Sequence, residues 1–262
     1  MQTVVLVKQV VDTEAEKRLL PGEWRLDRAS VENILNPYDE YAVEAAVQLK
    51  EELGGEVTVL SMGPQEAEEA IRKALAMGAD RGVLVSDPVL QGSDALATAR
   101  VLAQVLRGLG FDLVLCGSMS TDAQTGLVPA ALGELLDLPV LGAVNRLEVH
   151  GGSLKAARQT DEGAIVYECP LPAVVAVAKG INEPRYPSLR GIMGAKKKPL
   201  DTKTAADLAL ELGAVGLGGA RTRVHAATSV PPRAAGKTVT EYESPQEGAR
   251  LLADFLHENK LV

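Results

Sequence analysis

The sequence contains few residues that could form disulfides or bind metal ions. Cys116 and Cys169 are its only cysteines, too far apart for a CxxC pair and set in largely apolar surroundings. We therefore expect buried thiols in a reducing compartment and no disulfide. The three histidines, His150, His225 and His257, are scattered along the chain, so no recognisable metal-binding cluster is present in the sequence.

Long apolar runs are also missing. The longest one lies around residues 173–178, far below the length of about 20 residues that spans a bilayer. The first segment, MQTVVLVKQVVD, has no basic start and carries Lys8 within its apolar run, so it is expected to form a strand and not a signal peptide. We expect a protein without membrane insertion, located in the cytoplasm.

Two further absences concern function. The net charge of −8 argues against nucleic acid as the main partner, because phosphate backbones require clustered cations. The chain has no GxSxG, HExxH or Walker motif. Its motifs also suggest no nucleophile with a general base beside it. With 262 residues and 46% hydrophobic content it can still bury a large core. These features predict a globular protein that holds ligands and does not transform them.

The first half of the chain alternates between strand and helix patterns. Asn36 and Pro37 suit the first positions of a helix, and Asp39 and Glu40 suit the positive end of its dipole. We expect strands at 3–11, 56–61, 82–86 and 113–116, and helices at 37–53, 64–77, 94–109 and up to about 136. Such alternation predicts an α/β fold with a doubly wound parallel sheet.

The second half is less regular. Shorter strands are expected at 141–149, 153–158, 165–168 and 172–178, with a hairpin turn at Gly151-Gly152. After Lys198 the strand and helix patterns become irregular. The GLGG at 216–219 is expected to be a flexible turn, and a helix is expected at about 245–258. We therefore expect a nucleotide-binding domain at 1–198 and a C-terminal arm and helix at 199–262 that pack on a partner.

Two segments suggest binding sites. The turn 117–126 leads from a strand end into a helix, where α/β sheets bind ligands, and it is rich in hydroxyl groups that could contact an anion. Ordinary helix capping would explain one or two of these hydroxyls. Segment 182–198, NEPRYPSLRGIMGAKKK, fits neither a strand nor a helix pattern. Its aliphatic residues beside lysines have the composition of a protein docking surface, whereas for an arbitrary loop of this kind a solvated loop is the usual interpretation.

Segment 182–198 resembles the recognition loop of the β (small) subunit of electron transfer flavoproteins. The preceding RQTDEGAIVYECPLPAVVAVAKGI is similar to the signature region of that family. NPYDEYAVEAAVQLKE, LSMGPQEAEEAIRKALAMGADRG and VPPRAAGK resemble the family too, so the likeness covers nearly the whole chain.

The resemblance implies AMP bound by this subunit and FAD shared with an α subunit. Tyr38 would lie at the flavin edge, and Thr13 stands where many relatives have a second tyrosine. The loop after residue 117 is shorter than in many relatives. The positions implied in cofactor binding are Leu6, Asn36, Pro37, Tyr38, Asp39, Met62, Gly117, Ser118, Ser120, Thr121, Asp122, Gln124 and Thr125.

The resemblance also implies an electron carrier with three kinds of partner. These are an obligate α subunit, acyl-CoA and related dehydrogenases, and an electron transfer flavoprotein–quinone oxidoreductase, with the mitochondrial matrix as the location in a eukaryote. The implied docking residues are Leu189, Ile192, Met193, Lys196, Lys197 and Lys198. Two alternatives are a bifurcating member with a second FAD in place of AMP, and an adenine-nucleotide hydrolase or ATP-binding stress protein on the same sheet.

Overall fold

The computed structural model describes residues 1–228, 231 and 242–262. Contacts divide the chain into two units, 1–225 and 226–262. Residues 199–225, which the sequence assigned to the arm, thus pack within the first unit. The VPPRAAGK segment, residues 230–237, lies outside the described residues apart from Pro231. None of the helices in the described ranges is long and apolar enough to cross a membrane.

The first unit is built on a nine-stranded sheet in the order β11-β5-β4-β1-β6-β10-β7-β8-β9. All neighbours from β11 to β7 are parallel, and β8 and β9 extend the sheet with antiparallel pairs. The strands of the chain are β1 Gln2–Leu6, β2 Gln9–Val11, β3 Asn33–Leu35, β4 Glu56–Met62, β5 Arg81–Val85, β6 Leu113–Gly117, β7 Val140–His150, β8 Ser153–Thr160, β9 Gly163–Pro170, β10 Ala173–Val177 and β11 Leu200–Lys203.

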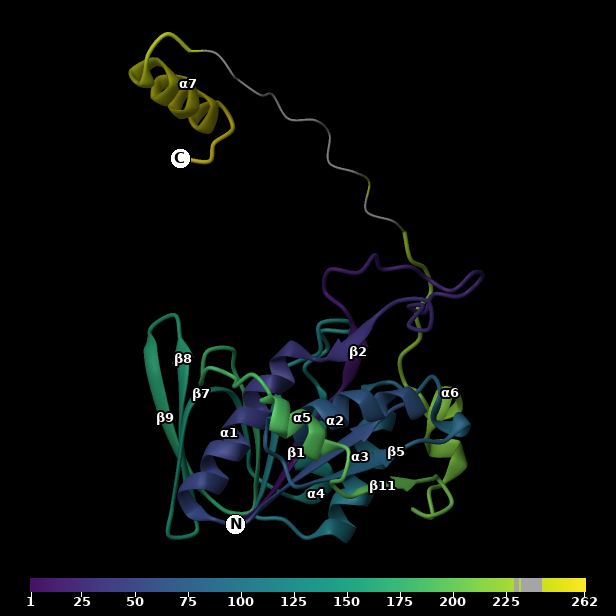
Figure 1. Cartoon of the computed structure of the whole chain (residues 1–262). Coiled ribbons are helices and arrows are strands. Elements are labelled where there is room, and N and C mark those ends of the chain that lie inside the picture. The colour runs from purple at the N-terminus through teal and green to yellow at the C-terminus, as the bar shows by residue number, and fades with distance from the viewer. Residues whose placement is uncertain (229–230, 232–241) are drawn as a thin grey trace. The chain divides into compact units, whose positions relative to one another are not determined.

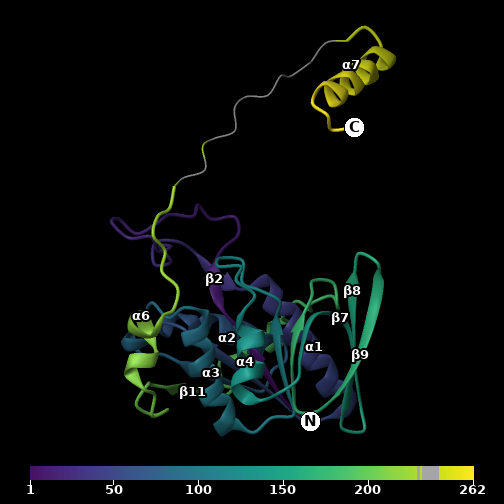
Figure 2. The same cartoon turned by 180° about the vertical axis from the view of Figure 1, so that it is seen from behind.

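Helices cover both faces of this sheet. Helices α1 and α2 pack on one face and α3 and α4 on the other (Figures 1 and 2). The α-helices are α1 Pro37–Leu53, α2 Glu68–Met77, α3 Ala95–Leu109, α4 Val128–Leu136, α5 Leu189–Ala195, α6 Gly216–Gly219 and α7 Pro245–Glu258, and the 3-10 helices are η1 Gln65–Ala67, η2 Pro88–Leu90 and η3 Leu212–Ala214. The expected doubly wound α/β fold is confirmed.

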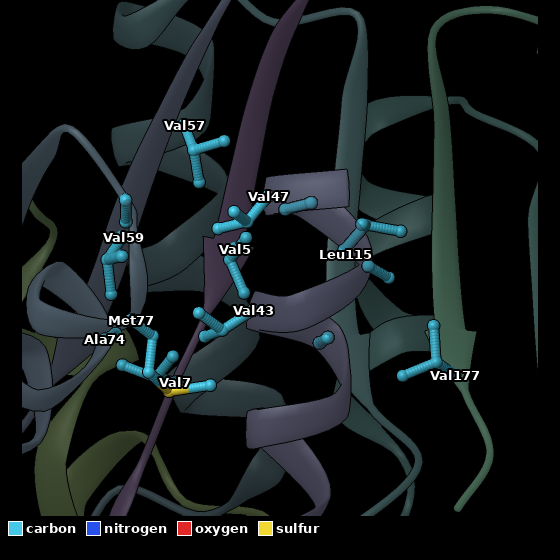
Figure 3. Close-up of a cluster of buried hydrophobic side chains, with 14 of the residues drawn as sticks. Val5, Val7, Val43, Val47, Val57, Val59, Ala74, Met77, Leu115 and Val177 are labelled. Atoms are coloured by element: carbon cyan, nitrogen blue, oxygen red, sulfur yellow. The ribbon is translucent and has the colours of Figure 1, made fainter. Parts of the chain in front are cut away.

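The near-continuous apolar strands reflect burial on both faces. Val5 and Leu115 point toward α1 and pack with its Val43 and Val47 (Figure 3). The preceding residue on β1, Val4, belongs to the core beneath α3 and α4. Successive side chains of a strand point to opposite faces of the sheet. Each central strand is covered on both faces, so it needs apolar residues at its odd and at its even positions.

Three expectations for chain segments were wrong. The single strand at 3–11 is divided into β1 and β2, because the chain leaves the large sheet at Lys8 and β2 pairs with β3 in a separate two-stranded sheet. The GLGG segment forms the short helix α6, where a Cβ on Gly216 would lie 2.1 Å from the carbonyl oxygen of Val89. Cys169 is only half-buried, since it lies on the edge strand β9, whereas Cys116 is buried and both thiols are free.

The segment 182–198 also contains a helix that its sequence did not predict. Helix α5 is seven residues long, and the Ser188 hydroxyl caps it by accepting the Gly191 N–H at 3.0 Å. Two glycines within so short a helix weaken the helical pattern of the sequence. Tertiary contacts with α2 stabilise α5, and a sequence pattern does not show such contacts.

Candidate functional site

The candidate site lies where the strand order reverses. From β1 the chain adds β4 and β5 on one side of β1, and then places β6 on the other side. The segments that leave the carboxyl ends of β1 and β6 therefore diverge, which is where open α/β sheets form ligand crevices. Lys8 follows β1, the segment 117–127 starts at the last residue of β6, and helix α1 begins at the same edge with Pro37.

Asp39 joins these three elements. Its carboxylate accepts the backbone N–H of Lys8 at 2.8 Å and that of Gly117 at 3.2 Å. Burial raises the pKa of Asp39 to about 7, although the two N–H groups, the Asn36 side chain and the charge of Lys8 favour the ionised form. With both oxygens engaged and 6% of the residue exposed, Asp39 holds the strand ends against α1.

Asn36 connects α1 to the segment after β6. It occupies the N-cap position, as expected, but its side chain does not cap the helix. Its amide nitrogen donates to the carbonyl oxygen of Met119 at 2.9 Å, and its amide oxygen accepts the Thr121 N–H at 3.2 Å. This buried side chain therefore fixes the shape of the segment 117–127, while the first N–H groups of α1 remain without a side-chain partner.

Two cations share one buried carboxylate beside the site. Asp122, whose side chain is 1% exposed, lies 2.8 Å from the Lys8 ammonium and 2.5 Å from the Arg28 guanidinium. The Lys8 ammonium also donates to the Ser120 hydroxyl at 3.3 Å. This group of three charges carries one net positive charge. Arg28 belongs to the segment between β2 and β3, so the ion pair joins that segment to the site.

Asp122 should make the folding stability depend on pH in the acidic range. Burial alone would raise its pKa, but the charge of Lys8 and hydrogen bonds from Lys8, Arg28 and Ser120 lower its pKa from 3.8 to about 2. Because the folded pKa lies below the unfolded one, the stabilisation is present above about pH 4 and is lost as the pH falls toward 2.

We predict that Asp122→Asn lowers the free energy of unfolding by about 2 kcal/mol at neutral pH. The difference from the wild type should shrink as the pH falls from about 4 to 2, and urea titrations across that range would measure it. Asp161→Asn is the control, since Asp161 is exposed and has no ion pair among the described residues. Equal pH profiles for the two variants would contradict this role of Asp122.

The remainder of the segment after β6 is open to a ligand. Gln124, Thr125 and Gly126 are exposed, and Gln124 has a positive φ of 52°. The Thr121 hydroxyl is buried without a protein partner. Helix α4, which starts next, has no side-chain cap on its first turn. Hydroxyls, open helix N–H groups and a net positive charge fit the phosphate of a nucleotide.

The other positions expected at the site lie around this segment. Leu6 is buried at the end of β1, and Met62 is half-buried at the end of β4. Tyr38 is half-buried in the first turn of α1, and Ser118 directly follows β6 and is also half-buried. Lys8 and Arg28 were not among the predicted site residues, because a single cation forms no motif and only the fold brings both to Asp122.

A hollow at the start of α2 is a poorer candidate for an anionic ligand. It has a volume of about 460 Å³ and is lined by Gln65, Glu66, Glu68, Glu69 and Arg72. Three carboxylates against one guanidinium disfavour a phosphate there. Among the described residues no group of three or more histidine, cysteine or acidic side chains could hold a metal ion.

A second candidate site is the exposed surface of segment 182–198. The exposed fractions are 76% for Leu189, 65% for Met193 and 47% for Ile192. Tyr186, which was not among the predicted docking residues, is 97% exposed. We call these four residues the docking surface. Such grouped apolar exposure is typical of an interface.

The three lysines that follow α5 differ in their surroundings. Lys196 and Lys197 are exposed. Lys198 is half-buried, and its ammonium donates to the carbonyl oxygens of Leu75 at 2.8 Å and Ala79 at 2.5 Å. Burial lowers the pKa of Lys198. This lysine therefore joins segment 182–198 to the end of α2, and only Lys196 and Lys197 remain exposed beside the four apolar side chains.

Comparison with known proteins identifies the family of this chain. Residues 23–208 match the family model of the electron transfer flavoprotein domain. Electron transfer flavoprotein subunit beta of Mycobacterium bovis is 42% identical over 99% of this chain and 98% of its own length. The proteins of the same name from Thermoanaerobacterium thermosaccharolyticum and Bacillus subtilis are 39% and 42% identical over 92% and 80% of this chain, and over 92% and 82% of their own lengths. The chain therefore belongs to the electron transfer flavoprotein family, as a β subunit.

Proposed function

We propose that this β subunit works in a heterodimer that takes electrons from acyl-CoA and related dehydrogenases and passes them through FAD to a quinone reductase. The observation that carries the proposal is the presence of two sites in one family member. A nucleotide-compatible crevice lies at the switch point of the sheet, and an exposed apolar surface lies on segment 182–198. Family membership supports the flavin and the electron-carrier role.

We assign AMP to the crevice as a structural ligand. Gln124, Thr125 and the first turn of α4 would hold its phosphate, and the unpartnered Thr121 hydroxyl would gain a partner. Asn36 and Asp39 would act indirectly, since their side chains are occupied in shaping the segment after β6. No group in this set resembles a catalytic base next to a nucleophile, which disfavours nucleotide hydrolysis.

FAD, when bound with the α subunit, supplies the redox chemistry of the heterodimer. The contribution of this chain would be to pack beside the flavin and exclude water from it. Tyr38 would provide that contact, because its ring is half-buried in the first turn of α1, at the same edge as the crevice. An aromatic ring at this place would contribute packing and would not transfer protons.

The docking surface would receive the dehydrogenase. Leu189 and Met193 are exposed on one short helix, so they can enter an apolar pocket without rearrangement of the backbone. Lys196 and Lys197 on the rim would increase the association rate and its dependence on salt more than the affinity.

The C-terminal unit would pack on the α subunit. Helix α7 has no buried residue, and Leu251, Leu252 and Phe255 are exposed on it. An isolated helix of this length is marginally stable in water. A partner that covers these three side chains would stabilise it.

The proposal is tested by coexpression with the α subunit encoded in the same genome. The full chain should yield a heterodimer that retains FAD through gel filtration. A chain that ends at residue 225 should yield little complex, because it lacks the unit that we assign to the interface, while both core clusters remain. Absence of any flavin-containing complex with the full chain would contradict the proposed function, and equal yields would contradict the role of the C-terminal unit.

A further inference from the structure

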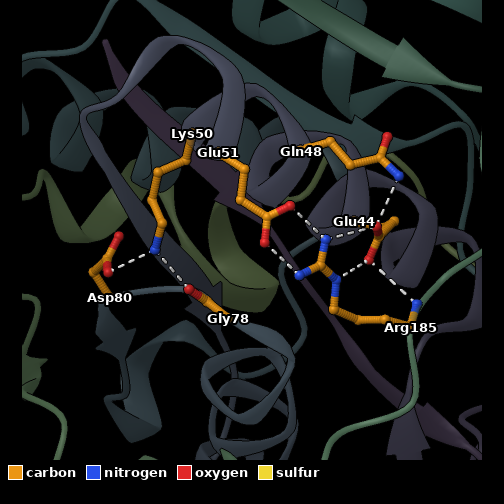
Figure 4. A network of polar contacts seen from close by, with 7 residues as sticks. All are labelled: Glu44, Gln48, Lys50, Glu51, Gly78, Asp80 and Arg185. Atoms are coloured by element: carbon orange, nitrogen blue, oxygen red, sulfur yellow. Dashed lines mark hydrogen bonds and ion pairs between the residues drawn. The ribbon is translucent and has the colours of Figure 1, made fainter.

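Segment 182–198 is attached to α1 through the side chain of Arg185. The Arg185 guanidinium lies between two glutamates of α1, with Nε at 2.8 Å from Glu44 Oε2 and Nη1 at 2.6 Å from Glu51 Oε1 (Figure 4). Its Nη2 donates to both residues, at 3.0 Å to Glu44 and 2.9 Å to Glu51. All the guanidinium nitrogens therefore engage carboxylates, a geometry that fixes the direction of the side chain.

The two glutamates differ in burial. The Glu44 side chain is 3% exposed, whereas that of Glu51 is 55% exposed. Glu44 also accepts the backbone N–H of Arg185 at 3.2 Å and a hydrogen bond from Gln48 at 2.8 Å. A buried carboxylate that loses its cation is strongly destabilised, whereas an exposed ion pair contributes little. Glu44 is thus the main partner of Arg185.

Other contacts fasten the segment on either side of the docking surface. Before it, Asn182 donates to the carbonyl oxygen of Tyr41 on α1 at 3.0 Å. After it, Arg72 of α2 donates to the carbonyl oxygens of Ala195 and Lys198, both at 2.9 Å. Tyr186 and Leu189 project between these two attachments, and Tyr186 directly follows Arg185.

We propose that Arg185 is a positioning residue for docking of the dehydrogenase. Its contacts with Glu44 and Glu51 hold Tyr186 and Leu189 in the orientation that the partner binds, while Arg185 itself is directed toward α1. Ordering a flexible segment on binding reduces affinity, so a segment that is ordered in advance binds more tightly. This inference rests on the docking role proposed above for segment 182–198.

The test compares two double variants of the heterodimer. Arg185→Met with Glu44→Gln removes the cation and its buried anion together, so no unpaired charge remains in the core. Lys50→Met with Asp80→Asn is the matched control, because it removes another ion pair of α1, with an N–O distance of 2.8 Å, whose hydrogen bonds go to Gly78 and Val57 and not to segment 182–198.

The measurement is the rate at which an acyl-CoA dehydrogenase reduces the heterodimer, as a function of heterodimer concentration. For Arg185→Met with Glu44→Gln we expect a KM for the heterodimer about tenfold higher than that of the wild type, with kcat unchanged. Reduction by dithionite, which needs no docking, should keep its wild-type rate. The control pair should leave all three quantities unchanged.

Three results would contradict the proposal or its basis. An unchanged KM for the Arg185 pair, while Leu189→Ala raises the KM, would overturn the positioning role alone. An unchanged KM for both would overturn the docking role of segment 182–198 as well. A rise in KM of the same size in the Lys50 pair would show that any loosening of α1 has this effect, and would also overturn a specific role for Arg185.

Discussion

Replacing Leu189 with alanine should raise the KM of an acyl-CoA dehydrogenase for the heterodimer by about 30-fold. Leu189 is 76% exposed in this chain, so most of it is available to a partner. Complete burial of a leucine side chain contributes about 2 kcal/mol, and a loss of 1.4 kcal/mol corresponds to about tenfold in affinity. The kcat and the FAD content should not change, because Leu189 lies outside the crevice.

The control for this variant is Leu212→Ala. Leu212 is 61% exposed in the same unit but lies in η3, outside the docking segment. Steady-state reduction assays at several heterodimer concentrations would separate KM from kcat. A KM unaffected by Leu189→Ala, or equally affected by both substitutions, would show that the dehydrogenase docks elsewhere.

Replacing Gly117 with alanine should damage the crevice and the fold together. A Cβ at this position would lie 2.5 Å from Asp39 Oδ1 and 2.7 Å from the carbonyl carbon of Tyr38. Relief of these contacts requires α1 to move away from β6 and breaks the hydrogen bond from the Gly117 N–H to Asp39. Overpacking of a core costs up to about 3 kcal/mol, which corresponds to a fall in Tm of about 10 °C for a unit of this size.

Gly117→Ala should also lower the AMP content of the purified heterodimer, because the segment 117–127 would lose its position relative to α1. Gly108→Ala is the matched control, since Gly108 lies on the exposed side of α3 with no atom within 4 Å of its ideal Cβ. Alanine there should raise stability by up to about 1 kcal/mol through helix propensity. Thermal unfolding and nucleotide analysis of both variants would decide, and wild-type values for Gly117→Ala would contradict the close packing described here.

The parallel sheet and its helices were predictable because their determinants are local. Asn36-Pro37 marked the start of α1 correctly, and Gly151-Gly152 marked the turn between β7 and β8, where both glycines have positive φ. Runs such as 173–177 indicated strands that are buried on both faces. In each case the signal lies within a few residues of the element that it predicts.

The contacts that shape the crevice could not be predicted, because they join residues far apart in the sequence. Asp39 suited a helix start, yet its carboxylate binds the N–H groups of Lys8 and Gly117. Likewise, the family resemblance of segment 182–198 implied docking but did not show that Lys198 is directed inward or that Arg185 contacts α1. Such roles depend on the fold that brings the elements together.

The most direct test of the account is the nucleotide content of the heterodimer. The complex of this chain with its α subunit would be denatured, and the released nucleotides separated and quantified by chromatography. The expected result is one FAD and one AMP per heterodimer, with AMP in the crevice at the switch point. Two FAD and no AMP would contradict it and would indicate a bifurcating electron transfer flavoprotein, whose second flavin occupies that crevice.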